Sequence, residues 1–389
     1  MMADLPPTSR RFRARLTAVL LVGVIVLGAI LYARPPVDLT IETGPEGGSY
    51  YLDAQHYQSI LATHGIHLRL KATPSSLEIA RDVANRRSGV DVGFIAQAIE
   101  PPKDETLFSL GQIELQPLFI FASAKLGRQT MLDDLRGRRI VMPPNDSATS
   151  DAAIRIFELY DITQDNTSFT YMPLADAAKQ LQAGKFDAGV FMLAPENPVI
   201  RTLANNSGLN LVPLLETKAI ANHLPFLRAV LLPRGIYNIA DGVPPNATPM
   251  VAAPVSVIVR AGLDPYLIFS LLEAMSTTHR APTFLTDAGE FPTPAGSVLT
   301  VHPLAVQYYT SGLPWIYRQL PPWLASAVDE DQLIGLGGFL LIALYLVAVG
   351  LADMAVAIMM LIGRRGRPSV ERHPAADDPR SATPVSGNK

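Results

Sequence analysis

Hydrophobic and polar residues alternate in short runs along the chain, and these runs are separated by stretches with helical periodicity. Residues 37–44 (VDLTIETG) alternate as a strand that ends in glycine. The next apolar residues recur on one side of a helix, for which Ser49 is the expected N-cap. The same order continues, with strands predicted at 66–73, 90–97, 115–123, 137–144, 168–173 and 187–193 and helices at 75–89, 150–162 and 175–186.

Strands separated by helices of this length predict parallel sheets with right-handed crossovers. Two such runs, 37–121 and 137–193, indicate two α/β lobes. A later strand at 253–262 and its helix at 265–279 are expected to return to the first lobe. Lobe I is therefore predicted to comprise 37–121 and 235–328, and lobe II to comprise 122–234. Ligands of such lobes bind at the carboxyl ends of strands, often in the cleft between lobes, which makes a hinged binding protein the predicted architecture.

Two apolar segments flank these lobes. Residues 16–33 carry no charge and are long enough to cross a bilayer as a helix, and Arg10, Arg11, Arg13 and Arg15 precede them. The basic cluster predicts that residues 1–15 are cytoplasmic. A cleaved signal peptide is the alternative. We favour an uncleaved anchor because Leu31 is a poor residue for the −3 position of a cleavage site after Ala33.

Residues 332–363 form the second apolar segment, which Asp353 interrupts. Three arginines follow it, so its C-terminal end is also predicted to face the cytoplasm. Asp353 has either a function within the bilayer or a place at the interface, and we favour the interface. Residues 364–389 are rich in Pro, Ala, Ser and charge, which predicts a disordered cytoplasmic tail. The body between the segments is expected outside the bacterial inner (cytoplasmic) membrane, in the periplasm or outside the cell.

Composition narrows the possible functions. The chain has no cysteine, which excludes disulfides and thiolate chemistry. Residues 35–331 hold 21 basic and 30 acidic groups, and this acidic balance argues against nucleic acid as a partner. The seven histidines show no HExxH or similar spacing, and there is no Walker loop or G-x-S-x-G elbow. The sequence thus predicts no catalytic cluster, no metal site and no cofactor.

The stretch GPEGGSYY (residues 44–51) joins the first strand to its helix. Glycines there allow positive φ and close approach of a ligand, while a helix start offers unpaired N–H groups that favour a carboxylate. An ordinary capped turn would have a similar composition. The candidate ligand-binding residues of this loop are Gly47, Gly48, Ser49, Tyr50 and Tyr51.

The loop at 145–150 repeats this arrangement in the second lobe, with hydroxyls at another helix start. A merely well-capped helix is again the alternative. Asp146 would repel an anion, so it either faces away or receives an amine. Gln97 ends a strand and offers both a donor and an acceptor. The further candidate residues are Ser147, Ala148, Thr149, Ser150, Gln97, Ala194 and Pro195, of which the last two would shape the cleft after strand 187–193.

Five stretches in order resemble the solute-binding subunits of TAXI-type TRAP transporters, a class of periplasmic binding protein. They are GPEGGSYY, DVGFIAQ, residues 135–162, residues 181–198 and residues 289–326, the last being similar to the closing segment of membrane-anchored members. One departure is PPNDSATS, which lacks the Gly-Ser-Gly-Thr of many relatives. The resemblance implies a periplasmic-binding-protein-like fold and favours the ligand-binding interpretation of the first loop.

The sequence therefore predicts a membrane-tethered receptor that binds a small carboxylate or amino acid between its lobes. The resemblance implies delivery to a TRAP-type permease that an ion gradient energises. The alternative is a membrane-anchored ligand sensor or assembly factor that uses the same fold without transport. An enzyme is a distant third possibility, since no catalytic constellation is present.

Overall fold

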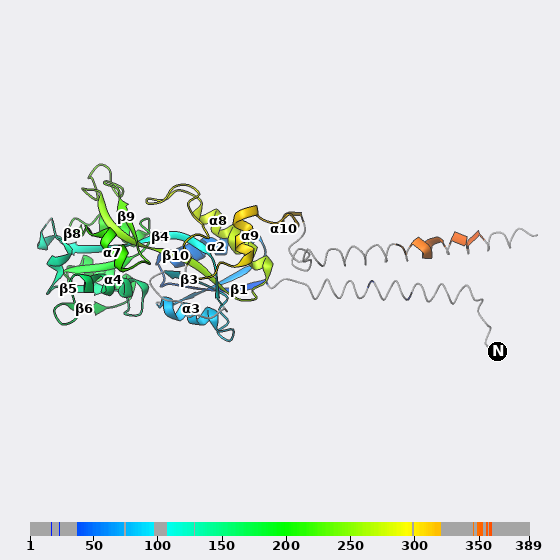
Figure 1. Ribbon diagram of the computed structural model, residues 1–389, viewed down its shortest axis with the longest axis horizontal. Coiled ribbons are helices and arrows are strands. Elements are labelled where there is room, and N and C mark those ends of the chain that lie inside the picture. Colours follow the sequence, from blue (N-terminus) through cyan, green and yellow to red (C-terminus); the bar gives the residue numbers. More distant parts are fainter. Residues whose placement is uncertain are drawn as a thin grey trace, which may run out of the picture. The chain divides into compact units, whose positions relative to one another are not determined.

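The computed structural model describes residues 37–73, 75–96, 107–127, 129–297 and 299–319, together with isolated helical positions at 17, 23 and between 345 and 359 (Figure 1). The chain divides into two units, Ala33–Ala327 and a second unit formed by Met1–Tyr32 with Val328–Lys389. We call the first unit the body.

The first half of the body begins with a parallel sheet. Its elements are β1 (Asp38–Thr43), α2 (Ser49–Thr63), β2 (His67–Ala72), α3 (Ser76–Ala84) and β3 (Val92–Ala96). The strands lie in the order β2–β1–β3, with both neighbours parallel to β1. The carboxyl ends of these strands therefore lie at one edge of the sheet, and α2 begins there.

The last part of the body packs on the same sheet. Strand β10 (Thr248–Arg260) pairs antiparallel with β3, and α8 (Pro265–His279) shares a buried core with α2. Helices α9 (Pro303–Ser311) and α10 (Trp315–Gln319) follow, and Ala305 of α9 is part of that core. Segments distant in the sequence thus complete the first lobe.

The second lobe repeats the parallel arrangement. Its central elements are β5 (Arg139–Met142), α4 (Ala148–Leu159), β6 (Ser168–Tyr171), α5 (Leu174–Gln182) and β7 (Ala188–Met192). The strands β6 and β7 flank β5 and run parallel to it. Shorter elements complete the lobe: η1 (Ala124–Leu126), η2 (Leu132–Leu135), α6 (Pro198–Ala204), β8 (Leu209–Leu211), α7 (Thr217–His223) and β9 (Arg228–Leu232).

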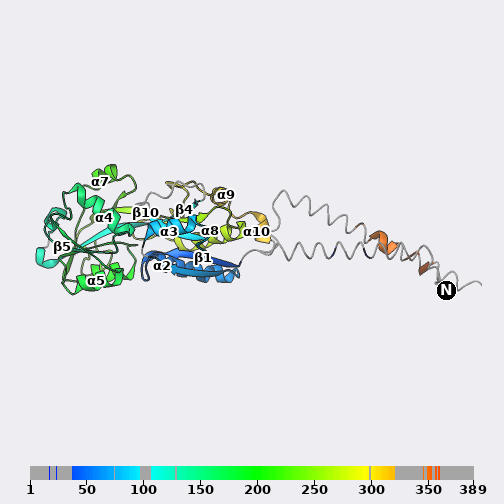
Figure 2. The ribbon, with the colours of Figure 1, turned by 90° about the horizontal axis from the view of Figure 1, so that it is seen from below.

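Both lobes share the long strand β4 (Leu107–Ser123). Its residues Leu107 to Pro117 pair with β10, and its residues Leu118 to Ala122 pair with β7 of the second lobe. Strand β10 likewise pairs with β3 of the first lobe and with β9 of the second. Two continuous strands therefore connect the lobes, giving a mixed α/β, two-lobed, periplasmic-binding-protein-like fold (Figures 1 and 2).

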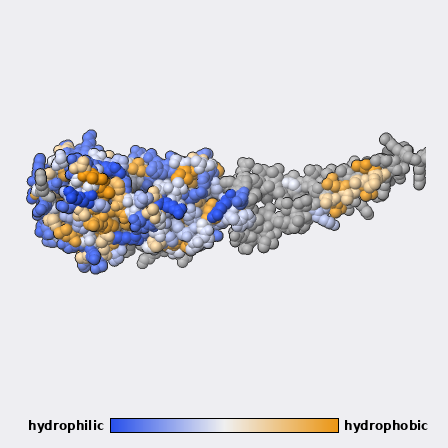
Figure 3. All heavy atoms as spheres, turned by 90° about the horizontal axis from the view of Figure 1, so that it is seen from above, coloured by the Kyte–Doolittle hydropathy of each residue, from blue (hydrophilic) through white to orange (hydrophobic). Residues whose placement is uncertain are grey.

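Apolar side chains fill both faces of each sheet. In β7, Ala188, Val190 and Met192 join the core beneath α4. Phe191 of the same strand and Leu193, which follows the strand, pack with α5 on the opposite face. In the first lobe, α2 and α8 cover one face and α3 covers the other. This explains the nearly continuous apolar runs of β3, β5 and β7, which lie in the interior of the sheets and are buried on both sides. Hydrophilic and hydrophobic residues are interspersed on the outer face of the body shown in Figure 3.

Three sequence predictions need correction. Parallel pairing holds within the two groups β1–β2–β3 and β5–β6–β7, but it is wrong for β4 and β10, which pair antiparallel with their neighbours. The strands β8 and β9, which were not predicted, are also antiparallel to their partners. Strand β4 begins eight residues before the predicted strand at 115–123. The N-cap of α2 is Gly48 and not Ser49, whose hydroxyl makes no capping hydrogen bond. Ser75 and Ser147 do cap α3 and α4, by accepting hydrogen bonds from the Glu78 and Ser150 N–H groups.

Among the described residues, no helix is both long enough and apolar enough to cross a bilayer. The predicted segments 16–33 and 332–363 lie almost entirely outside the described residues, as do the predicted cytoplasmic ends at 1–15 and 364–389.

Gly111 in the shared strand β4 generates a stability prediction. Its φ is 125°, and an added Cβ would lie 2.7 Å from Tyr309 Oη and 2.8 Å from Thr293 O. Gly127 is a matched control because its φ is 116° and an added Cβ would meet nothing within 4 Å. We expect Gly111→Ala to lower the free energy of unfolding by about 1–3 kcal/mol more than Gly127→Ala, the cost of overpacking. Urea denaturation followed by circular dichroism measures the difference, and equal losses would contradict the close approach.

Candidate functional site

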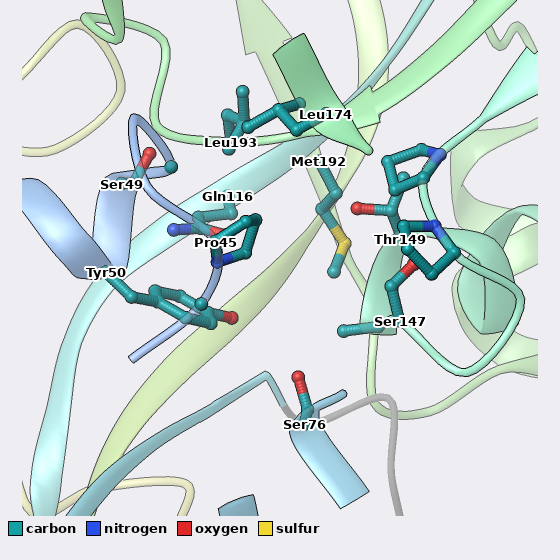
Figure 4. A pocket seen from close by; sticks show the side chains of 15 residues that line it. Pro45, Ser49, Tyr50, Ser76, Gln116, Ser147, Thr149, Leu174, Met192 and Leu193 are labelled. Atoms are coloured by element: carbon teal, nitrogen blue, oxygen red, sulfur yellow. The ribbon is translucent and has the colours of Figure 1, made fainter. Parts of the chain in front are cut away.

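A cavity of about 50 Å³ lies between the two lobes, at the carboxyl ends of their strands (Figure 4). The first lobe lines it with Gly44, Pro45, Gly48, Ser49, Tyr50 and Ser76. The second lobe contributes Pro143, Pro144, Ser147, Ala148, Thr149, Leu174, Met192 and Leu193. Gln116 of the shared strand β4 completes the lining, close to the position where that strand passes from one lobe to the other.

The first-lobe loop brings the start of α2 to the cavity. Gly47 adopts a φ of 77°, and the Gly48 N–H donates to Pro45 O at 2.9 Å. An added Cβ on Gly48 would lie 2.9 Å from that same oxygen, so the loop is closely wound. Tyr50 stacks on Phe94 with ring centroids 5.5 Å apart and an interplanar angle of 16°. The loop therefore holds an aromatic wall and a helix start in fixed positions.

The second-lobe loop places the start of α4 at the other side of the cavity. Ser147 accepts a hydrogen bond from the Ser150 N–H at 3.2 Å, and the Ser150 hydroxyl donates to Pro143 O at 2.8 Å. These bonds fix the loop, while Ala148 and Thr149 line the cavity. Asp146 is exposed and is not among the lining residues.

The chemistry of the cavity favours a small anion. None of the described residues that line it carries a charge. Three helix starts contribute to the wall: those of α2, of α3 at Ser76, and of α4. Free N–H groups in the first turn of a helix carry a partial positive charge and attract carboxylates and phosphates. Hydroxyl and amide groups add neutral hydrogen-bond donors and acceptors.

Hydrogen bonds join the lobes directly beside the cavity. The Ala194 N–H donates to Ser49 Oγ at 2.8 Å, and Asn197 Nδ2 donates to Gly47 O at 3.0 Å. Asn197 Nδ2 also lies 3.4 Å from Ser49 Oγ. We call this set the interlobe contact. Because it links the α2 start to the segment after β7, it holds the two walls of the cavity together.

The structure brings many of the predicted residues together. Gly48, Ser49, Tyr50, Ser147, Ala148 and Thr149 line the cavity, and Gly47 and Ala194 take part in the interlobe contact. Tyr51, Ser150 and Pro195 do not line the cavity. Tyr51 is half-buried on α2, whereas Ser150 and Pro195 are buried in the second lobe. Gln97 lies outside the described residues.

Sequence reasoning missed several residues at the site. Gln116 lies in the middle of an apolar run and is 2 % exposed, yet only its position at the crossing between lobes brings it to the cavity. Asn197 was also missed, although an Asn before Pro198 is typical of a helix N-cap. Its Oδ1 accepts the Val199 N–H at 2.9 Å, which leaves Nδ2 free for the interlobe contact.

Carboxylates lie next to the wall of the cavity. Gln116 Nε2 donates to Glu114 Oε1 at 2.5 Å. Burial raises the pKa of Glu114 to about 7, with the Gln116 hydrogen bond lowering it and the nearby Glu196 carboxylate raising it. Burial and the same two carboxylates, Glu114 and Glu196, raise the pKa of Asp53 well above its usual value. Burial likewise raises the pKa of Tyr50, and the nearby Glu114 and Asp53 carboxylates add to the rise.

Loss of the Ser49 hydroxyl tests the interlobe contact. In Ser49→Ala the Ala194 N–H loses its hydrogen-bond acceptor. A donor left unpaired in this way typically costs about 1–3 kcal/mol of stability. We expect the Ala194 amide to exchange with deuterium roughly tenfold faster or more, a change that corresponds to about 1.4 kcal/mol. Ser76→Ala is the matched control, because Ser76 lines the same cavity and has no interlobe hydrogen bond among the described residues. Equal exchange in both variants would show that Ser49 does not hold the lobes together.

The chain is similar to several solved structures. An amino acid ABC transporter substrate-binding protein, AbpA from Streptococcus pneumoniae, bound to L-arginine, is 12 % identical over 75 % of this chain and 97 % of its own, with a TM-score of 0.38. The regulatory domain of CcmR from Synechocystis PCC6803, in complex with 2-PG, is 14 % identical over 63 % and 98 %, with a TM-score of 0.43. A histidine kinase sensor domain with similarity to periplasmic binding proteins is 17 % identical over 61 % and 89 %, with a TM-score of 0.39.

The family assignment rests on the sequence itself. The model of the NMT1-like family matches residues 41–311, a range that includes both helix starts, the shared strands β4 and β10 and the interlobe contact. Since that range covers well over half of the residues, the chain belongs to the NMT1-like family.

Proposed function

We propose that this protein is a membrane-tethered extracytoplasmic solute receptor that binds a small organic anion or amino acid and delivers it to a TRAP-type permease. The observation that carries the proposal is the meeting of helix starts from two lobes at one uncharged cavity. A carboxylate there would receive N–H groups from both lobes without a cationic side chain.

The proposed receptor closes around its ligand. Since β4 and β10 are continuous between the lobes, a change of twist in these two strands would separate or approach the walls of the cavity. A ligand favours the closed state only to the extent that it contacts both lobes, and the helix starts of α2 and α4 offer such contacts. The interlobe contact adds a small, ligand-independent bias toward closure.

The TAXI assignment and the membrane attachment rest on the sequence. The Gly-Gly-Ser-Tyr-Tyr loop that resembles the TAXI subunits provides the α2 start at the cavity. Apolar segments 16–33 and 332–363, each flanked by arginines, support two anchors with cytoplasmic ends. Tethering would keep the receptor at a high effective concentration beside its permease.

Ligand binding is tested with Gly48→Val. The added side chain meets Pro45 O and enters the cavity wall, so we expect loss of ligand-induced thermal stabilisation. Gly208→Val is the control, since Gly208 lies in an exposed turn away from the cavity. The full-length protein in detergent would be screened with mono- and dicarboxylates and amino acids, guided by mass spectrometry of co-purified ligand. A ligand at 100 times its Kd stabilises by about 2.7 kcal/mol in the unmodified protein.

Retention of the full ligand-induced shift in Gly48→Val would place binding elsewhere. Uptake of the identified radiolabelled ligand by cells lacking this protein separates transport from sensing. Reduced uptake supports delivery to a permease, whereas unchanged uptake supports a ligand sensor or assembly factor.

The proposed topology is tested with alkaline phosphatase, which is active only outside the cytoplasm. We expect activity for a fusion after residue 331 and none for a fusion after residue 389, because the arginines at 364, 365 and 367 retain the C-terminal end in the cytoplasm. Activity of both fusions would contradict the second anchor. An N-terminal epitope tag that remains on the mature protein would distinguish an anchor from a cleaved signal peptide.

A further inference from the structure

A group of metal-ligating side chains lies in the first lobe, outside the lining of the cavity. Asp53 of α2, Glu114 of β4 and His279 at the end of α8 each present one ligand atom, and these atoms all lie within 4.8 Å of one another. Three elements that are distant in the sequence therefore converge on one point. We call this group the Asp–Glu–His cluster.

Each member is fixed by the element that carries it. Asp53 is three residues after Tyr50 and four before Tyr57, so all three share one side of α2. Glu114 is two residues before Gln116 and lies on the same side of β4. The His279 ring is oriented by a 2.8 Å contact between its Nε2 and the Tyr57 hydroxyl. Asp53 thus lies one helical turn from Tyr50, and Glu114 is hydrogen-bonded to Gln116, so the cluster adjoins two residues of the cavity wall.

The cluster contains a carboxylate oxygen that no described neighbour satisfies. Asp53 Oδ2 is buried and has no hydrogen-bond partner among the described residues. Glu114 receives a hydrogen bond from Gln116, and neither carboxylate forms an ion pair with a described Lys or Arg. The Glu196 carboxylate of the second lobe is close enough to raise the pKa of both. Buried carboxylates without a cationic partner carry a large desolvation cost, which a bound cation would offset.

We propose that the Asp–Glu–His cluster binds a first-row divalent transition-metal ion of the Zn²⁺ or Mn²⁺ class. Imidazole nitrogen favours such ions over Mg²⁺ and Ca²⁺, which prefer all-oxygen sites, and carboxylates complete a mixed N/O set. Ligands at about 2.1 Å from one ion lie about 3–4 Å apart, so the cluster contracts slightly on binding. Three protein ligands leave coordination positions for water.

The ion would stiffen the wall of the cavity. Asp53 and Glu114 would be held by coordination, and with them the α2 turn that carries Tyr50 and the β4 residue Gln116. This inference does not depend on transport, since it requires only the cluster itself.

The test measures metal content directly. Full-length protein in detergent is stripped with a chelator, dialysed against micromolar Zn²⁺ or Mn²⁺, and analysed by inductively coupled plasma mass spectrometry. We expect the unmodified protein to bind one ion per chain with high affinity. In Glu114→Gln and in His279→Gln we expect the affinity for that ion to fall at least about 100-fold. Glu114→Gln conserves shape and its acceptor for Gln116, so the fold is expected to persist.

Two matched controls exclude adventitious binding at the surface. His67→Gln removes an imidazole whose side chain is 76 % exposed, and Glu158→Gln removes an exposed carboxylate of α4. Both are expected to retain the ion and the metal-induced rise in melting temperature. The proposal is overturned if the unmodified protein takes up no ion, if Glu114→Gln binds it with unchanged affinity, or if Ca²⁺ and Mg²⁺ bind as tightly as Zn²⁺ and Mn²⁺.

Discussion

Continuity of β4 and β10 between the lobes is the constraint on which the rest of this structure depends. Parallel strands in each lobe end toward helix starts, but separate lobes would leave these ends far apart. Because β4 changes its partner from β10 to β7 between Pro117 and Leu118, the carboxyl edges of both sheets meet. The cavity is therefore a consequence of strand pairing, and part of its polar lining consists of backbone N–H groups at helix starts, which any loop sequence of the right shape would supply.

Ser49 and Asn197 illustrate how ligand binding and lobe closure share the same atoms. The Ser49 hydroxyl lines the cavity and also accepts the Ala194 N–H from the second lobe. Asn197 uses Oδ1 to cap α6 and Nδ2 to reach Gly47 O. Ligand groups that reach Ser49 therefore act on an atom that already joins the lobes, so affinity and closure are coupled at this position.

Neutral polar groups line the cavity, and carboxylates lie next to its wall. Neutral hydroxyls, amides and helix starts surround the space itself, whereas Asp53 and Glu114 lie next to Tyr50 and Gln116. Burial lowers the pKa of His279 to about 3, so its imidazole is neutral at physiological pH and provides no positive charge to the carboxylates. A cation would restore electrostatic balance there without placing charge in the cavity.

Local patterns in the sequence determined the parallel βαβ units, the glycine-rich and serine-rich helix starts and six of the fifteen residues that line the cavity, because strand alternation, helix periodicity and capping depend on near neighbours. Tertiary structure decided the antiparallel pairing of β4 and β10, the place of Gln116, and the convergence of Asp53, Glu114 and His279. Those residues are separated by 61 and 165 positions and show no ligand spacing. Only the packing of α2, β4 and α8 around one core brings them together, since burial and not sequence proximity sets such contacts.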